Sequence, residues 1–161
     1  MRVVIKEAGY LISYSFSELE KNKETYPIFC NITKDGLKRT KEFHNFSLEE
    51  SIKKVLDLMD DFDEDSSLGA FAIFPVETRE RKSESLHTAI MTLIRVDSEV
   101  EIQILQRYHF KDELLYLEPY RVIYAEGIEE EELKKLEKYY LKGIMDYQEG
   151  KEIWLRSFAK I

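Results

Sequence analysis

The sequence contains one cysteine, Cys30, among its 161 residues, and only six glycines and three prolines. A single cysteine excludes an internal disulfide and a zinc centre built from cysteines, and it fits a reducing compartment. The scarcity of glycine and proline excludes collagen-like and low-complexity chains. The glycines are also too dispersed for a phosphate-binding or dinucleotide-binding loop. We therefore predict no cofactor.

Long apolar runs are also missing, and none approaches the length that spans a bilayer. Residues 2–7 lack the apolar segment and small-residue cleavage site of a secretory signal. The formal net charge of -8 repels phosphate backbones and anionic lipids. These absences predict a cytoplasmic protein that binds neither nucleic acid nor membrane, and they favour a basic partner.

The composition, 43% hydrophobic and 35% charged, is typical of a folded chain, and the length fits one domain over residues 1–161. The clearest element is a β-hairpin with strands at 88–96 and 100–108. Its strands flank a three-residue polar connection at Asp97, Ser98 and Glu99. Symmetric pairing about Ser98 places Arg95 opposite Glu101, a favourable cross-strand pair.

Other segments have weaker patterns. We expect strands at 2–7 and 10–16, a polar loop at 17–25, and a second hairpin from 27–33 and 37–43 around an Asp35-Gly36 turn. Ser47 and Glu50 have capping-box spacing, which predicts a helix over 47–60. A strand buried on both faces should follow at 68–76, then an exposed connector at 77–85, a last strand at 120–125, a helix after Gly127 and a final helix after Gly150. The order predicts an α+β fold, a single domain with a mostly antiparallel sheet of about six to seven strands, one internal helix and C-terminal helices.

Nucleophilic catalysis would need Cys30 or a serine near a histidine, and the histidines are His44, His87 and His109. Cys30 lies in the middle of a predicted strand, where a small buried thiol is the simpler interpretation. Paired carboxylates carry little signal in a chain with 32 acidic residues. We therefore predict no catalytic residues.

An acidic run follows the internal helix. Asp61, Asp63, Asp65 and Ser67 occupy positions one, three, five and seven of a calcium-binding EF-hand loop. Ser66 and Ala72, however, replace the glycine and glutamate that such a loop requires at positions six and twelve. We therefore predict no metal site, and we interpret the run as a solvated loop or a patch that faces a basic protein partner: Asp57, Asp60, Asp61, Asp63, Glu64 and Asp65.

A second candidate lies on the polar face of the first hairpin, where Arg95, Arg107 and His109 could line a pocket for an anionic small molecule. The same side chains could instead form the rim of a covered sheet. The basic residues Arg79, Arg81 and Lys82 alternate with glutamates, which favours a solvated loop over a nucleic-acid patch.

The leading hypothesis is a non-catalytic protein that binds another macromolecule, such as an immunity protein or antitoxin that masks a basic toxin. It depends on the net acidity, two acidic clusters and ten tyrosines, a residue common in protein interfaces. One alternative is an enzyme or ligand-binding domain with the anion pocket described above. Another is a structural subunit of a homo-oligomer.

Overall fold

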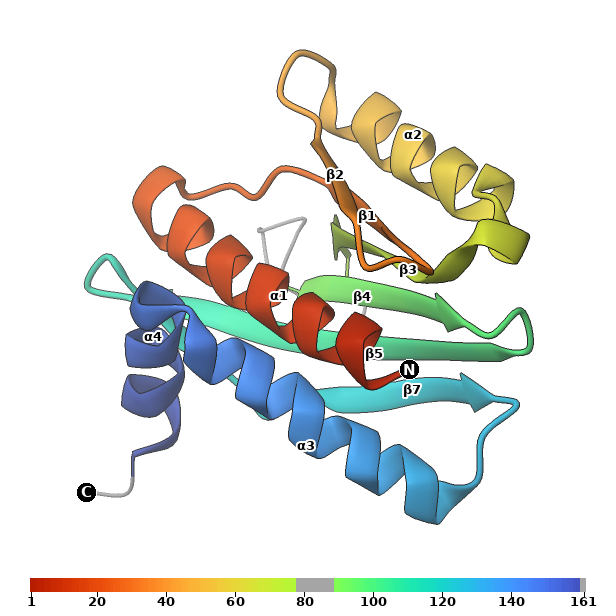
Figure 1. The fold of residues 1–161 in the computed structure, drawn as a ribbon. Coiled ribbons are helices and arrows are strands. Elements are labelled where there is room, and N and C mark those ends of the chain that lie inside the picture. Colours follow the sequence, from red (N-terminus) through yellow and green to blue (C-terminus); the bar gives the residue numbers. More distant parts are fainter. Residues whose placement is uncertain (78–88, 160–161) are drawn as a thin grey trace.

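The computed structural model describes residues 1–77 and 89–159, which form one domain of four α-helices and a curled seven-stranded sheet (Figure 1). The elements follow in the order α1 (Arg2–Asn22), β1 (Ile28–Thr33), β2 (Lys38–Glu42), α2 (Leu48–Asp61), the 3-10 turn η1 (Glu64–Ser66), β3 (Ser67–Val76), β4 (Ala89–Val96), β5 (Val100–Lys111), β6 (Leu114–Leu117), β7 (Arg121–Glu126), α3 (Glu130–Asp146) and α4 (Gln148–Phe158).

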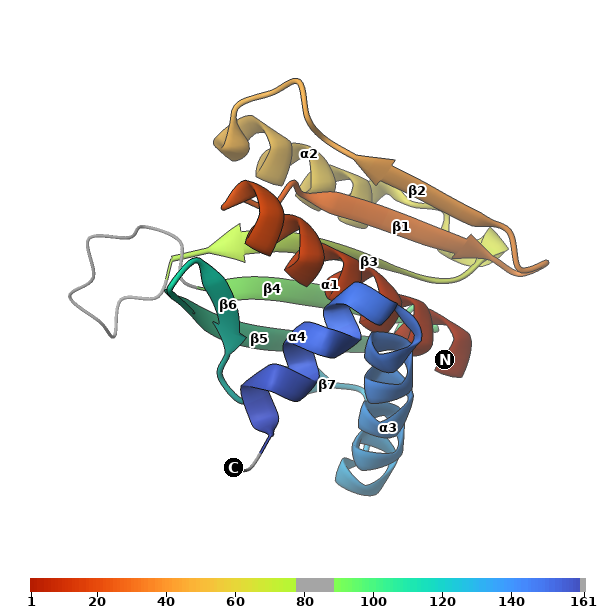
Figure 2. The same cartoon turned by 90° about the vertical axis from the view of Figure 1, so that its left-hand side faces the viewer.

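Every strand pair in the sheet is antiparallel, and the strand order is β2-β1-β3-β4-β5-β6, with β7 paired to β5. Helices α1, α3 and α4 cover one face of the sheet (Figure 2). Helix α2 packs on the opposite face, against β1 and β3. The predicted α+β fold with a mostly antiparallel sheet is thus confirmed.

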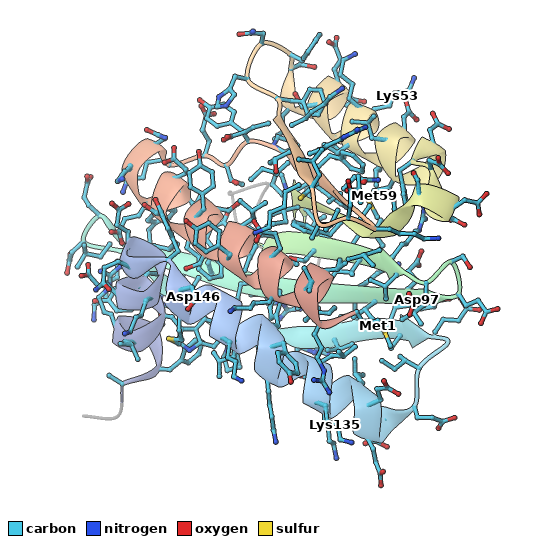
Figure 3. The ribbon with its side chains drawn as sticks, in the orientation of Figure 1. Met1, Lys53, Met59, Asp97, Lys135 and Asp146 are labelled. Atoms are coloured by element: carbon cyan, nitrogen blue, oxygen red, sulfur yellow. The ribbon has the colours of Figure 1, made fainter. Side chains whose placement is uncertain are left out.

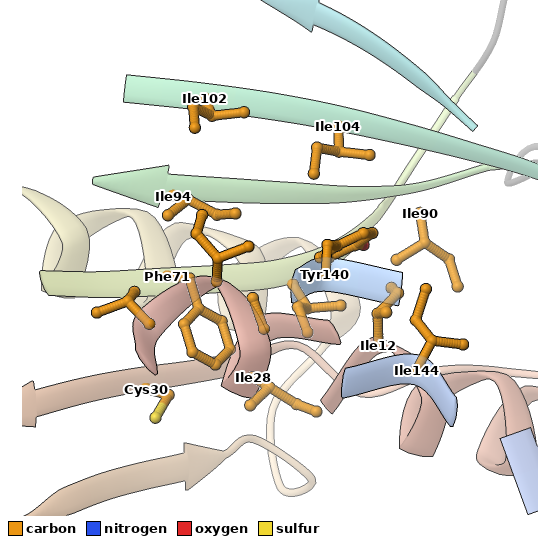
Figure 4. Close-up of a cluster of buried hydrophobic side chains, with 14 of the residues drawn as sticks. Ile12, Ile28, Cys30, Phe71, Ile90, Ile94, Ile102, Ile104, Tyr140 and Ile144 are labelled. Carbon is orange, nitrogen blue, oxygen red and sulfur yellow. The ribbon is translucent and has the colours of Figure 1, made fainter. Parts of the chain in front are cut away.

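The hairpin that the sequence marks most clearly is β4 and β5, and its predicted register is confirmed. Arg95 pairs with Glu101 and Val96 with Val100 across the three-residue connection. One face of this hairpin, which includes Ile94, Ile102 and Ile104, forms part of the main core. Figure 4 shows these side chains gathered with those of α1, α3 and β3.

Strand β3 is buried on both faces, as its continuous apolar run predicts. Phe71 and Ile73 face the main core under α1, whereas Ala70, Ala72 and Phe74 face a smaller core under α2. Helix α2 begins as the capping-box spacing predicts, because the Ser47 side chain accepts a hydrogen bond from the Glu50 backbone N–H.

The predicted strands at 2–7 and 10–16 are wrong, because residues 2–22 form the single helix α1, which also replaces most of the predicted loop at 17–25. The β-branched start and the alternation of apolar residues with serine from Leu11 to Ser17 resemble strand patterning. Helix α1 packs against the sheet on one side and against the neighbouring helices α3 and α4 on another. Because it is buried on two sides, its apolar residues do not form the single stripe of a surface helix.

Small residues on the second buried side of α1 let the neighbouring helices approach closely. Gly9 faces the backbone of Tyr140, and Gly143 of α3 faces the backbone of Lys6. Ser13 donates a hydrogen bond to the Ile144 carbonyl, with 2.8 Å between Oγ and O. These contacts fix residues 6–13 of α1 against α3.

The C-terminal helices differ from the prediction in one detail, and one strand was not predicted. The break between α3 and α4 falls at Tyr147, whereas Gly150, the predicted separator, lies inside α4 and packs against Ser13. The short strand β6 was missed. The predicted strand at 120–125 is confirmed as β7.

A cluster around Glu149 joins α4 to α1 and predicts an acid-sensitive contact. Ser17 and Lys21 of α1 and the Tyr147 hydroxyl all donate to Glu149 Oε2, at 2.7, 2.9 and 3.2 Å. The hydrogen bond from Ser17, followed by those from Lys21 and Tyr147, lowers the pKa of Glu149 from 4.5 to about 2.

A carboxylate whose pKa is lowered on folding stabilises the fold above its ordinary pKa, and this contribution disappears as the pH falls through the lowered value. We therefore expect Glu149→Gln to reduce the loss of thermal stability between pH 4.5 and about 2. Melting temperatures of both proteins across this range test the prediction. Parallel curves for the two proteins would contradict it.

The predicted basic connector cannot be compared with the structure. Most of residues 77–85 lie outside the described residues, and these include Arg79, Arg81 and Lys82. Among the helices of the described residues, none is long and apolar enough to cross a membrane.

Candidate functional site

The predicted acidic patch lies at the C-terminal end of α2 and in η1. All six residues are exposed: Asp57, Asp60, Asp61, Asp63, Glu64 and Asp65. Asp63 also has a local role, since its side chain caps η1 by accepting from the backbone N–H of Asp65 at 3.1 Å. The 3-10 turn lets the chain reverse from α2 into the buried strand β3, so the carboxylates stay on the surface.

Arg95 connects this patch to the β4–β5 hairpin. Its guanidinium donates to Glu101 at 2.8 Å, and to Asp60 and the Met59 carbonyl, each at 2.9 Å. The connection of Asp97, Ser98 and Glu99 therefore lies at the same end of the molecule as the last turn of α2 (Figures 1 and 3).

A third acidic segment reaches this end through β7. Glu126 of β7 pairs with Glu101, and Gly127 follows with a φ of +79°. A Cβ on Gly127 would lie 2.2 Å from the Glu99 carbonyl oxygen, so glycine allows the chain to pass directly against the hairpin connection. Helix α3 then starts with a run of glutamates, residues 129–132.

We call this surface the acidic end: residues 57–65, Asp97, Glu99, Glu101, Glu126 and residues 129–132. It combines two acidic clusters that lie about 70 residues apart in the sequence. A run of acids at a helix N-terminus is favoured by the helix dipole, which accounts for the second cluster locally. The first cluster follows the C-terminus of α2, where the dipole disfavours negative charge, so its acids have no such local stabilisation.

Few of these carboxylates are neutralised within the described chain. Asp60 and Glu101 share Arg95, and Glu130 lies 3.7 Å from the Lys134 ammonium. The side chains of Asp57, Asp61, Glu64 and Asp65 form no hydrogen bond or ion pair with any described residue. Asp61 and Asp63 do line a cleft of about 490 Å³ that also contains Arg39 and Lys41 of β2.

Exposed apolar side chains lie on the sheet next to the acidic end. Ile102 and Ile104 point into the main core, so Glu101, Gln103 and Leu105 lie on the other face of β5. Tyr124 pairs with Gln103, and a bulge in β7 adds Ile123 beside it. Ile123 is 46% exposed and Tyr124 is 41% exposed. An aromatic and apolar centre beside a charged rim is typical of protein interfaces.

The second candidate set, Arg95, Arg107 and His109, does not form one pocket. Arg95 pairs with Glu101, six residues along β5 from Arg107, which corresponds to roughly 20 Å. Arg107 and His109 do share a face of β5. His109 is half exposed, stacks on Tyr116 with 5.8 Å between ring centroids, and lies 4.0 Å from Glu118. Arg95 instead donates hydrogen bonds to Glu101 and Asp60, which belong to the acidic end.

Nucleophilic chemistry at Cys30 is disfavoured by its surroundings. Its side chain is fully buried in β1, and this burial raises the pKa of the thiol to about 11, although the Thr40 hydroxyl donates to Sγ at 3.5 Å. The thiolate is the reactive form of cysteine. We expect Cys30 to resist iodoacetamide at pH 8 in the native protein and to react fully in denaturant, as mass spectrometry would measure. Rapid labelling of the native protein would contradict this.

Within the described residues, no cluster of three or more histidine, cysteine, aspartate or glutamate side chains has a geometry that could hold a metal ion. Sequence patterns identified the acidic run after α2 and the acids that begin α3. They did not identify Asp97, Glu99, Glu126, Ile123 and Tyr124, because their relevance depends on the pairing of β7 with β5. Comparison with models of protein families, with curated proteins and with solved structures gives no match for this chain.

Proposed function

We propose that this chain is a non-catalytic binding protein whose acidic end holds and masks a basic macromolecular partner, in the manner of an immunity protein or antitoxin. The observation that supports this best is that two acidic clusters, far apart in the sequence, lie at the same end of the sheet. Asp57, Asp61, Glu64 and Asp65 repel one another in the free protein, and none of them forms an ion pair with another described residue. A basic partner would relieve that repulsion.

The character of the partner follows from the surface. A field of negative charge steers a positively charged protein toward the acidic end and repels nucleic acid and anionic lipid. Ile123 and Tyr124 add the apolar contact that charge alone does not supply, since buried aromatic side chains contribute much of the binding energy in protein interfaces. A cytoplasmic location, indicated by the single cysteine, forms part of this proposal.

Affinity capture from the native cells tests the proposal with three proteins. The first is the wild type. The second, the acid-neutral variant, carries Asp57→Asn, Asp61→Asn, Glu64→Gln and Asp65→Asn. The third is a control with the same change of net charge away from the acidic end: Glu77→Gln, Asp112→Asn, Glu113→Gln and Glu152→Gln.

We expect the wild type and the control to recover the same basic protein in stoichiometric amount, and the acid-neutral variant to lose it. The eight substituted acids are all exposed, so both variants should fold. Recovery of no stoichiometric partner, recovery of an acidic partner, or equal retention by the acid-neutral variant would each overturn the proposal.

A further inference from the structure

A pocket lined by aromatic rings lies at the opposite end of the sheet from the acidic end. It has a volume of about 360 Å³ and lies where the C-terminus of α1, the start of α2 and the far end of β5 meet. The rings that line it are those of Tyr26, Phe43, His44, Phe46 and Tyr108. Tyr108 is seven residues along β5 from Glu101, or roughly 24 Å, so this pocket and the acidic end are separate.

The rings are held in place by contacts with each other and with the protein. Tyr26 and His44 lie 4.1 Å apart between ring centroids, and the His44 Nε2 atom is 3.3 Å from a Glu42 carboxylate oxygen. Phe43 and Phe46 lie 6.3 Å apart. Glu42 also accepts hydrogen bonds from the Tyr14 hydroxyl of α1. The walls are therefore largely formed before any ligand binds, as is usual for small-molecule sites.

Two residues with hydroxyl groups line the same pocket. Thr25 is 5% exposed and Ser51 is 1% exposed, and neither hydroxyl forms a hydrogen bond with another described residue. Neither hydroxyl oxygen is among the described side-chain atoms that are both fully buried and without a partner, so both remain accessible from the pocket. Each hydroxyl can donate one hydrogen bond and accept others. The pocket thus offers polar groups that a ligand could satisfy.

The charged residues around the pocket are already engaged. The Lys23 ammonium donates to the carbonyls of Glu20 and Glu113, and Glu24 accepts from the Tyr26 hydroxyl. His44 has Glu42 as its partner. Lys23 and Glu24 also carry opposite charges, so together they favour neither an anionic nor a cationic ligand. A neutral ligand needs no counter-ion.

We propose that this pocket binds a small, neutral heteroaromatic molecule, whose flat ring packs among the aromatic side chains and whose polar edge bonds to Thr25 and Ser51. Stacked and edge-on aromatic pairs favour a planar ring over an aliphatic one of the same volume. Hydrogen bonds to the two hydroxyls select a ring that carries both donors and acceptors. A nucleobase has these properties.

Adenine and indole are suitable probes, because both are flat two-ring molecules but only adenine carries several donors and acceptors along its edge. We expect adenine to shift the NMR signals of the Tyr26, His44 and Phe46 rings with a dissociation constant of about 1 mM or lower. Indole should bind at least about fivefold more weakly, and the Thr25→Val, Ser51→Ala variant should lose this preference.

Ser15→Ala is the matched control, since it removes a buried hydroxyl that is not part of the pocket lining. It should bind adenine as the wild type does. The single variants Thr25→Val and Ser51→Ala replace the double variant if the latter does not fold. The proposal is overturned if adenine leaves the three rings unshifted, if indole binds as tightly in the wild type, or if removal of the hydroxyls leaves the adenine preference unchanged.

Discussion

Replacement of Gly143 by valine is expected to lower the free energy of unfolding by more than about 3 kcal/mol or to prevent folding. A Cβ at this position would lie 2.0 Å from the Lys6 carbonyl oxygen and 2.8 Å from the Tyr10 backbone nitrogen. Both are backbone atoms of α1, so no side chain can rotate away. Urea unfolding followed by the fluorescence of Trp154 measures the change.

Helix propensity alone predicts a different result. Glycine inside a helix costs up to about 1 kcal/mol relative to alanine, and valine is a better helix former than glycine. The steric effect should exceed this gain, because α1 must separate from α3 and expose core residues such as Ile12 and Phe16.

Gly36→Ala is a useful comparison. Gly36 has a φ of +87° but open space around its Cβ position, so strain of about 1 kcal/mol is expected there. A Gly143→Val protein as stable as the Gly36→Ala protein would contradict the close packing of α1 and α3.

The other large effect concerns partner binding. Reversal of charge at Asp57, Asp61, Glu64 and Asp65, each to lysine, is expected to weaken binding of the captured basic partner by about 100-fold or more. Most of the loss should appear in the association rate, because exposed charges act mainly by steering the encounter. Stopped-flow or surface binding measurements at several salt concentrations test this, and the wild-type rate should fall steeply as salt increases.

The exposed apolar residues should act differently. Ile123→Ser with Tyr124→Ser is expected to increase the dissociation rate and to leave the salt dependence unchanged, since these side chains contribute contact but no charge.

The variant with the four acids replaced by lysine, the reversed variant, should match the wild type in thermal stability. The four acids that it replaces form no hydrogen bond or ion pair with another described residue. Equal association rates for the wild type and the reversed variant would contradict electrostatic steering by the acidic end.

Local patterns predicted the elements whose environment is simple. The β4–β5 hairpin packs one face on the core and has a polar turn, so alternation and turn chemistry fixed its register, including the Arg95 and Glu101 pair. Helix α2 has one buried stripe and a serine cap, and both were visible in the sequence. Strand β3 is buried on both faces, which its uninterrupted apolar run indicated.

Helix α1 was missed because its neighbours, and not its own pattern, determine which residues are buried. Val4, Ile5, Ile12 and Phe16 pack into the core, while Gly9 and Ser13 contact α3. A sequence read without those neighbours shows β-branched residues and alternating serines.

The acidic end could be predicted only in part from the sequence, for a similar reason. Each cluster could be seen in the sequence, but their placement at one end of the sheet depends on the close approach of Gly127 to the Glu99 carbonyl and on the Arg95 link to α2.

The binding proposal makes one prediction that does not depend on any substitution. Amide hydrogen exchange of the wild-type chain, alone and with the captured basic partner, maps the surface that the partner covers. We expect slower exchange in residues 57–66, 97–101 and 121–132, and no change in residues 23–27 and 43–48, which border the aromatic pocket. Protection confined to other segments, with unchanged exchange at the acidic end, would contradict the proposal that this end holds the partner.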